Sequence, residues 1–404
     1  MNAQPVPQSP ETLDTTGATT VAAVARPQVA GARRVVVKLG TRVLMDERGE
    51  LAQQRVSTLV AAVAGLAASG REVLLVSSGA VGTGLGSLQL DRRPSWPELK
   101  GTCAAVGQGM LMAFYQGAFR RFGVPCGQFL VGQRDLEVRR RALGLRQTLD
   151  VMLSRGLVPV INENDAVETA ASARTPGGGE RAFADNDRLA AILAALLGAD
   201  LLVLLTDVAG VYERDPRRHP EARLLAEVAD AAALGRVVAG VGSQAGFGRG
   251  GMRSKVEAAT IAQKSGCATV IADGAEPGSL SHLLAGEALG TFFPAGPRPD
   301  ALDRWIACAA RPHGTLQLDA GAVAALVDGR ASLLATGVTG VDGRFEDGDV
   351  VELRGPGGAL VGRALLAMDD ARCRELAGAP KVTLVRRQYV VLAEGLPQAV
   401  GGAA

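Results

Sequence analysis

The sequence predicts an α/β fold, in which a three-layer α/β/α sandwich encloses a mainly parallel sheet and a small, mainly β domain follows. Short, continuously apolar runs recur along most of the 404 residues, as in strands that are buried on both faces of a parallel sheet. Ala- and Leu-rich stretches of helical length separate these runs. After Pro294 the pattern changes to short segments divided by turn signals such as Asp328-Gly329 and Asp347-Gly348, which indicates a β domain.

The elements of the sandwich are expected in order along residues 34–295. The apolar runs predict strands at Arg34–Lys38, Val73–Ser77, Leu157–Ile161, Leu201–Thr206 and Ala268–Ala272. The stretches between them predict helices at Gln53–Ala68, Ala104–Phe122 and Asp187–Leu197. Because strands and helices alternate, we expect helices on both faces of one sheet.

Composition marks the limits of the two domains. Residues 1–33 are rich in Ala, Pro, Thr, Val and Gln, and we expect them to form a flexible tail. Three prolines within Pro294–Pro299 indicate a linker, placed at 296–313, between the sandwich at 34–295 and the β domain at 314–394. A C-terminal tail is expected at 395–404.

The bulk composition argues against several classes of protein. The net charge is +2, so nothing draws the chain as a whole to nucleic acid or to an anionic membrane. No apolar stretch is long enough to span a bilayer, and the first residues lack the pattern of a signal peptide. The five cysteines are scattered without a C-x-x-C pair and the three histidines lack metal-ligand spacing, so we expect reduced thiols, no protein-held metal and a cytoplasmic location.

Three polar or glycine-rich clusters follow predicted strands, where ligands gather in open α/β sheets. Lys38–Thr41 places an ammonium group and a glycine where they can meet a phosphate. Ser77–Gly86 has small residues at a strand-to-helix turn, which can cradle an anion. In Asn162–Asp165, Asp165 could hold an α-ammonium group and Asn162 could bond a carboxylate. The alternatives are a surface lysine, an ordinary tight turn and a solvated loop.

Two more clusters lie where helices are expected to begin. Asp185-Asn186-Asp187 carries two carboxylates, which either cap the helix or orient lysines, substrate or a magnesium shell. Gly246–Lys255 is a glycine-rich loop that leads to a lysine and then a helix, which is the geometry of a phosphate site unless it is a mobile surface loop. It contains G-x-G-x-x-G, but no clear strand precedes it, which argues against a dinucleotide-binding dehydrogenase. Together the five clusters favour phosphoryl transfer, which needs cations and exact positioning more than covalent chemistry.

Seven motifs, in order and spacing, resemble the glutamate 5-kinase family of the amino-acid kinase superfamily, in its bacterial form with a C-terminal PUA domain. The resemblance covers about residues 34–390. The motifs are Val36–Thr41, Ser78–Ala80, Ala104–Gln108, Pro159–Asp165, Asp185–Asp187, Leu205–Asp207 and Gly250–Met252.

The resemblance implies a role for each matching residue. Lys38 and Lys255 would neutralise the transferring phosphoryl group, and Asp187 would hold the two lysines in register. The substrate-binding residues would be Ser78, Asp165, Asn186 and Asn162. ATP, which brings Mg²⁺, would be bound by Lys38, Thr206, Asp207, Arg249, Gly250, Gly251, Met252, Arg253, Ser254 and Lys255.

This sequence departs from the family pattern at a few positions. Arg42 stands where a small residue is usual, Arg249 and Gln133 replace threonines, and Gly177–Gly179 make the approach to Asp185 richer in glycine. These changes concern affinity and regulation. They leave the expected reaction unchanged. That reaction needs no general base, because the side-chain carboxylate of glutamate, with a pKa of about 4.3, is already an anion at neutral pH, and this fits five clusters that contain no histidine.

The implied reaction is phosphorylation of the side-chain carboxylate of L-glutamate to γ-glutamyl phosphate, the first step of proline biosynthesis. A separate glutamyl phosphate reductase would act next, proline would inhibit by feedback, and the enzyme would form a homo-oligomer. One rival is another kinase of the superfamily, acting on aspartate, acetylglutamate, carbamate or a nucleotide. A second is an RNA-binding protein, but residues 311–404 carry ten Lys/Arg against eleven Asp/Glu, without the basic footprint that RNA binding needs.

Overall fold

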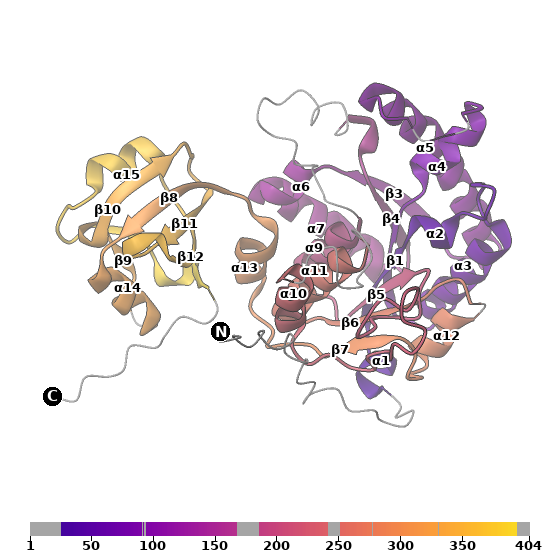
Figure 1. Ribbon diagram of the computed structural model, residues 1–404. Coiled ribbons are helices and arrows are strands. Elements are labelled where there is room, and N and C mark those ends of the chain that lie inside the picture. The colour runs from indigo at the N-terminus through magenta and orange to yellow at the C-terminus, as the bar shows by residue number, and fades with distance from the viewer. Residues whose placement is uncertain are drawn as a thin grey trace, which may run out of the picture.

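The computed structural model describes residues 26–393 except 91, 93, 168–185, 241–250, 277 and 330. A large domain and a smaller β-rich domain lie side by side, with helix α13 between them (Figure 1). Residues 1–25 of the predicted N-terminal tail and the whole predicted C-terminal tail at 395–404 lie outside the described residues, as do Asp185, Arg249 and Gly250.

The large domain is built on a seven-stranded sheet in the order β3-β4-β2-β1-β5-β6-β7. Six strands run parallel, and β7 pairs antiparallel with β6. The strands are β1 (Arg34–Leu39), β2 (Glu72–Ser77), β3 (Cys126–Val131), β4 (Val158–Glu163), β5 (Leu201–Thr206), β6 (Ala268–Asp273) and β7 (Thr291–Phe293). The predicted mainly parallel sheet is therefore confirmed, and its five predicted strands are all present.

Helices cover both faces of this sheet (Figure 1). Alternate residues of each strand point into two separate cores, as the two-residue period of a strand requires. Val35 and Val37 pack with α3 and α5, whereas Val36 packs with α7, α9 and α11. This is the predicted three-layer α/β/α arrangement.

The helices of the large domain lie between and after its strands. They are α1 (Pro27–Ala30), α2 (Thr41–Leu44), α3 (Gln53–Ala68), α4 (Ala80–Ser87), α5 (Pro97–Arg120), α6 (Gln133–Glu137), α7 (Arg139–Ser154), α9 (Asn186–Leu197), α10 (Ala231–Gly240), α11 (Gly251–Lys264) and α12 (Ser279–Leu284). Helix α11 begins at Gly251, so the second half of the glycine-rich cluster is helical rather than a loop.

The smaller domain has a five-stranded sheet in the order β10-β8-β11-β12-β14 and a two-stranded sheet of β9 and β13. The strands are β8 (Pro312–Leu318), β9 (Leu333–Leu334), β10 (Val338–Gly343), β11 (Val350–Arg354), β12 (Leu360–Leu365), β13 (Thr383–Val385) and β14 (Val390–Leu392). The helical segments are α14 (Ala320–Val327), α15 (Asp370–Leu376) and three short 3-10 turns, Ala335–Gly337, Pro356–Gly358 and Arg387–Tyr389. A mainly β domain after Pro294 was predicted and is present.

The expected linker between the domains is a packed segment. It holds α13 (Ala301–Arg304) and a π-helical turn, Trp305–Ala309. Trp305 and Ile306 are buried in the same core as α9, and Val350 and Leu365 of the smaller domain join that core. The segment therefore belongs to the hydrophobic core, which a count of prolines does not reveal.

The expected N-terminal tail also ends earlier than residue 33. Residues 27–30 form α1, and Val29 is fully buried. Arg26 donates hydrogen bonds to the carbonyl oxygens of Ala226, Leu289 and Gly290. These contacts fix residues 26–33 against the large domain.

Candidate active site

The predicted clusters meet at one edge of the sheet. Strands β4, β2, β1 and β5 are neighbours and run parallel, so their carboxyl ends lie together. Asn162, Ser78, Lys38 and Thr206 lie at or just after these four ends. Helix α9, which begins with Asn186 and Asp187, follows a segment outside the described residues.

Asp187 joins the two predicted lysines. Its Oδ1 lies 2.6 Å from Nζ of Lys38, and its Oδ2 lies 2.9 Å from Nζ of Lys255. The hydroxyl of Ser254 also donates to Oδ2, at 3.0 Å. The side chains are 6%, 1% and 10% exposed for Lys38, Asp187 and Lys255. Strand β1 and helices α9 and α11 thus hold two ammonium groups on opposite oxygens of one buried carboxylate.

The charges of this triad shape its chemistry. Burial alone would raise the pKa of Asp187, but the ammonium groups of Lys38 and Lys255 outweigh it and lower the pKa from 3.8 to about 2. The carboxylate is therefore ionised at neutral pH. Two positive charges around one negative charge leave a net positive charge, which suits a phosphoryl group carrying several negative oxygens.

We expect the stabilising contribution of the Asp187 carboxylate to disappear in acid. Its folded-state pKa of about 2 lies below its ordinary value of 3.8, so the contribution is complete above about pH 4 and is lost as the pH falls towards 2. Urea unfolding of the wild type and of Asp187→Asn between pH 2 and 6 measures this. The difference in free energy of unfolding should stay constant above pH 4 and shrink below it; a difference that persists unchanged to pH 2 would contradict the assignment.

A second cluster joins the predicted substrate-binding residues. Nδ2 of Asn186 lies 3.0 Å from Oγ of Ser78 and 2.9 Å from Oδ1 of Asn162, to which it donates. Nδ2 of Asn162 donates to Oε1 of Gln108 at 2.9 Å. The carbonyl oxygen Oδ1 of Asn186 is buried and accepts no hydrogen bond from the residues that the structure describes. A buried acceptor without a donor is costly, so this oxygen is suited to a ligand that carries N–H groups, such as an ammonium ion.

The structure adds supporting residues that the sequence had not singled out. Gln108 lies within a matched motif but had no assigned role, and it fixes the Asn162 amide. The hydroxyl groups of Tyr115 and Ser77 lie 2.8 Å apart beneath Ser78, and burial raises the pKa of Tyr115. Lys100 of α5 lies 3.4 Å from the Asp165 carboxylate. An uncharged Gln or Tyr inside a helical pattern resembles a core residue, so only the fold shows what these side chains hold.

A pocket of about 350 Å³ opens beside the triad. It is lined by Lys38, Gly40, Thr41, Arg42, Val43, Asp187, Thr206, Asp207, Val208, Gly210, Tyr212, Arg214, Asp215, Pro216, Arg217, Gly251, Met252 and Lys255. Of the residues predicted to bind ATP, six are in this lining: Lys38, Thr206, Asp207, Gly251, Met252 and Lys255. Ser254 instead bonds Asp187, and Arg253 pairs with Glu257 at 2.8 Å on the surface of α11.

Three arginines of the pocket were not predicted as site residues. Nη1 of Arg42 lies 2.6 Å from Oδ2 of Asp207, and Nη2 of Arg217 lies 3.6 Å from the same oxygen. Burial acts to raise the pKa of Asp207, but the hydrogen bond from Arg42 and its charge give a net lowering. Arg214 is the third. The arginine-rich run after β5 was a sequence signal for this cationic wall.

Within the described residues, no group of three or more His, Cys, Asp or Glu side chains is arranged to hold a metal ion. No helix in the same part of the chain has the length and apolar character needed to cross a membrane.

Comparison with known proteins agrees with the family that the sequence motifs resemble. Residues 33–273 match the model of the amino acid kinase family, and residues 314–387 match that of the PUA domain. A glutamate 5-kinase of Streptomyces coelicolor is 44% identical over 90% of this chain and 94% of its own length. Those of Myxococcus xanthus and Thermus thermophilus are each 44% identical, covering 87% and 83% of this chain and 91% and 87% of their own lengths. The chain therefore belongs to the amino acid kinase family and, within it, to the glutamate 5-kinases.

Proposed function

We propose that this protein transfers the γ-phosphoryl group of ATP to the side-chain carboxylate of free L-glutamate. The observation that carries the proposal is the Lys38–Asp187–Lys255 triad, which lies in the wall of a nucleotide-sized pocket and continues through Asn186 into the Ser78–Asn162 cluster. The product is γ-glutamyl phosphate, and the step is the first of proline biosynthesis.

The residues of the site lower the barrier to phosphoryl transfer by offsetting the repulsion between the two anionic substrates. A carboxylate oxygen of glutamate forms a bond to the γ-phosphorus while the bond from that phosphorus to the β,γ-bridging oxygen breaks, and ADP leaves. Lys38 and Lys255 offset the repulsion between the two anions, and Asp187 keeps both ammonium groups in place. The nucleotide brings Mg²⁺ as part of the substrate. No proton has to be removed, which agrees with an active site built without a histidine.

Each ligand has its own set of residues in this proposal. Ser78, Asn162, Asp165 and Asn186 bind glutamate, with the buried Oδ1 of Asn186 available to its ammonium group. ATP occupies the pocket beside the triad, where Thr206, Asp207 and the Arg249–Lys255 segment contact it. Arg42 and Arg217 on either side of Asp207 place further positive charge near the phosphates.

The direct test is ATP turnover with and without glutamate, with hydroxylamine trapping the acyl phosphate. We expect a hydroxamate only when glutamate is present. A parallel panel of aspartate, acetylglutamate, carbamate and nucleoside monophosphates separates the rival kinases. ADP release with one of these and not with glutamate would overturn the proposal.

Asp165→Asn is expected to weaken glutamate binding and to leave ATP binding unchanged. Removing a charged partner of the ammonium group should cost about 1.5–3 kcal/mol, or roughly ten- to a hundredfold in affinity. Calorimetry with glutamate and with a non-hydrolysable ATP analogue measures the two effects separately. Equal losses for both ligands would indicate a folding defect or a wrong site, and the unfolding temperature of the variant distinguishes these.

The remaining partners extend the same proposal. A separate reductase consumes the labile acyl phosphate, and proline inhibits by occupying part of the glutamate pocket, because it resembles a cyclised glutamate that lacks one carboxylate. The protein acts in the cytoplasm as a homo-oligomer. RNA binding by the smaller domain is the less favoured alternative, since residues 311–404 are close to neutral. Proline titration against glutamate tests the inhibition, which excess glutamate should relieve.

A further inference from the structure

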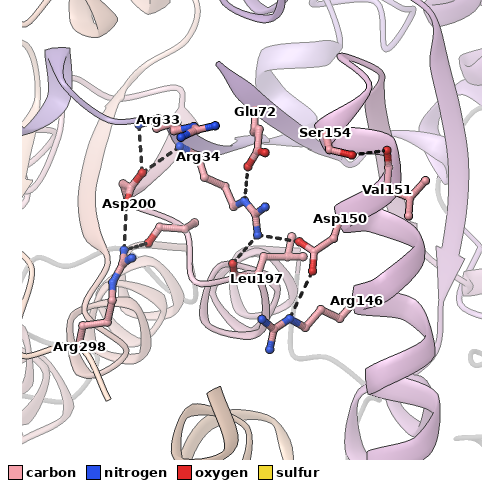
Figure 2. Close-up of polar contacts among 11 residues, drawn as sticks. Arg33, Arg34, Glu72, Arg146, Asp150, Val151, Ser154, Leu197, Asp200 and Arg298 are labelled. Atoms are coloured by element: carbon pink, nitrogen blue, oxygen red, sulfur yellow. Dashed lines mark hydrogen bonds and ion pairs between the residues drawn. The ribbon is translucent and has the colours of Figure 1, made fainter. Parts of the chain in front are cut away.

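Helix α9 ends among three arginines that come from distant parts of the chain. The last carbonyl groups of a helix lack partners within the helix and attract cations. Within the last turn, Arg34 donates to the carbonyl oxygen of Leu197 (2.6 Å) and Arg304 to that of Ala195 (2.7 Å). Arg298 donates to that of Ala199 (3.0 Å), two residues beyond the helix. Figure 2 shows the first of these contacts, together with the ion pairs of Arg34 and Arg298.

Arg304 differs from the other two arginines in its charge balance. Arg34 pairs with Glu72 and Asp150, and Arg298 pairs with Asp200. Arg304 is only 8% exposed, and its Nη1 donates to the carbonyl oxygen of Pro299 at 2.6 Å. Among the described residues no carboxylate forms an ion pair with Arg304. A buried guanidinium whose hydrogen bonds go to carbonyl groups, with no carboxylate at ion-pair distance among the described residues, is costly to keep, so a role beyond packing is expected.

The end of α9 is shaped to admit this guanidinium. Gly198 follows the helix with φ of +62°, and the amides of Gly198 and Ala199 bond the carbonyl groups of Ala195 and Ala194. This is a Schellman ending, which favours glycine. A Cβ atom on Gly198 would also lie 2.9 Å from Nη2 of Arg304. The glycine thus permits both the turn and the close approach of Arg304.

Helix α9 connects this contact to the candidate active site. Its first turn carries Asn186 and Asp187, and every residue from Leu189 to Leu197 is buried. A helix of 12 residues spans about 18 Å. Because tightly packed interiors do not absorb small shifts, a displacement at Ala195 moves the amide and the carboxylate at the other end.

We propose that Arg304 is a positioning residue, which fixes the C-terminal end of α9 and thereby the placement of Asn186 and Asp187. This inference rests on the proposed function, because the two residues have their roles only in that reaction. Arg304 precedes the π-helical turn. Arg363 of β12 donates to the carbonyl groups of Ile306 and Ala307 within that turn and of Ala310 just after it. Through Arg363, the smaller domain therefore fixes the segment that carries Arg304, and Arg304 in turn fixes the end of α9.

The test compares Arg304→Met with Arg304→Lys and with the control Arg298→Met. Arg298 lies in the same region, but its contacts are with Ala199 and Asp200, which follow the helix. Its replacement is therefore a matched control. We expect Arg304→Met to lower kcat and to raise the KM for glutamate, with about a tenfold loss in kcat/KM, while the KM for ATP stays within about twofold. Arg304→Lys should recover most of the loss, since an ammonium group can still donate to a carbonyl oxygen. Arg298→Met should leave all constants near wild type.

Amide hydrogen exchange supplies a readout that needs no substrate. A positioning role predicts that Arg304→Met speeds exchange through residues 186–191 at the far end of α9, and that Arg298→Met does not. Faster exchange confined to the last turn, or a lower unfolding temperature with wild-type kinetic constants, would show a purely structural role and overturn the proposal. If Arg304→Met does not fold, Gly198→Ala disturbs the same contact from the helix side and must show the same kinetic and exchange changes.

The two proposals fail in different ways. A wild-type protein that makes no glutamyl hydroxamate rejects the proposed function. Wild-type exchange over residues 186–191 in Arg304→Met and Gly198→Ala rejects the positioning role, whatever the substrate is.

Discussion

Replacing either lysine of the triad is expected to lower kcat by about 100- to 1000-fold, with only a small change in the KM for glutamate. Removing one preorganised group that stabilises transition-state charge typically has an effect of this size. Lys38 and Lys255 face charge that shifts from the γ-phosphoryl group towards ADP, so their loss falls on the transition state more than on the bound substrate. In the single variants Asp187 retains its other ammonium partner, at 2.6 or 2.9 Å, so the triad is not left with an unpaired carboxylate.

The experiment is steady-state kinetics on Lys38→Ala and Lys255→Ala, with Lys264→Ala as a matched control. Lys264 is on the same helix as Lys255 but in its last turn, far from the carboxyl edge of the sheet. The control should keep the wild-type kcat. Lys255→Arg should remain well below wild type, because a planar guanidinium does not fit the position of a point charge. Near-wild-type kcat in either alanine variant would remove that lysine from the mechanism.

The central strands of the fold were predictable because each is buried on both faces and therefore apolar along its whole length. Strand β3 was missed for the opposite reason. It is an edge strand in which Cys126, Gln128 and Leu130 remain partly or largely exposed, so it has no continuous apolar run. Strand β7 has three residues, too few for a periodic signal. A strand can be predicted from a single sequence when it is buried on both faces, because it is then apolar along its whole length.

The candidate site was predictable where its residues follow strand ends, and not where they lie within helices or loops. Lys38, Asn162 and Thr206 stand directly at the ends of apolar runs. Gln108 and Tyr115 lie inside α5, where they resemble other core residues until their hydrogen bonds are seen. The partner of Asp207 could not be predicted from spacing, since Arg42 and Arg217 approach it from separate segments.

A chain that ends at Gly296 is expected to lose its fold, whereas one that ends at Arg311 should fold and remain a kinase. The linker that the sequence predicts at 296–313 would place the shorter cut between two independent domains. The structure instead shows packing across this boundary. Trp305 and Ile306 are 5% and 0% exposed in the core of the large domain, and Nε1 of Trp305 donates to the carbonyl oxygen of Leu136 at 2.9 Å.

The size of the effect follows from what each cut removes. Losing a buried tryptophan alone typically costs about 3–5 kcal/mol, and the shorter chain also loses Ile306, Arg298 and Arg304. The sum approaches the total stability of an ordinary domain, about 5–15 kcal/mol. The longer chain keeps these residues and loses the cover that Val350 and Leu365 provide, together with the hydrogen bonds from Arg363. It should therefore unfold at a lower temperature than the full chain but retain its secondary structure.

Circular dichroism and glutamate-dependent ADP release on the two truncated chains measure these outcomes. Because all the residues proposed to bind ATP or glutamate precede residue 256, the chain ending at Arg311 should keep the wild-type KM for ATP. Its kcat should fall modestly, because the segment that carries Arg304 loses its hydrogen bonds from Arg363. If this chain is folded yet cannot phosphorylate glutamate, the smaller domain takes part in catalysis directly. A stable, active chain ending at Gly296 would mean that the contacts of Trp305 and Arg304 contribute little to either the fold or the placement of α9.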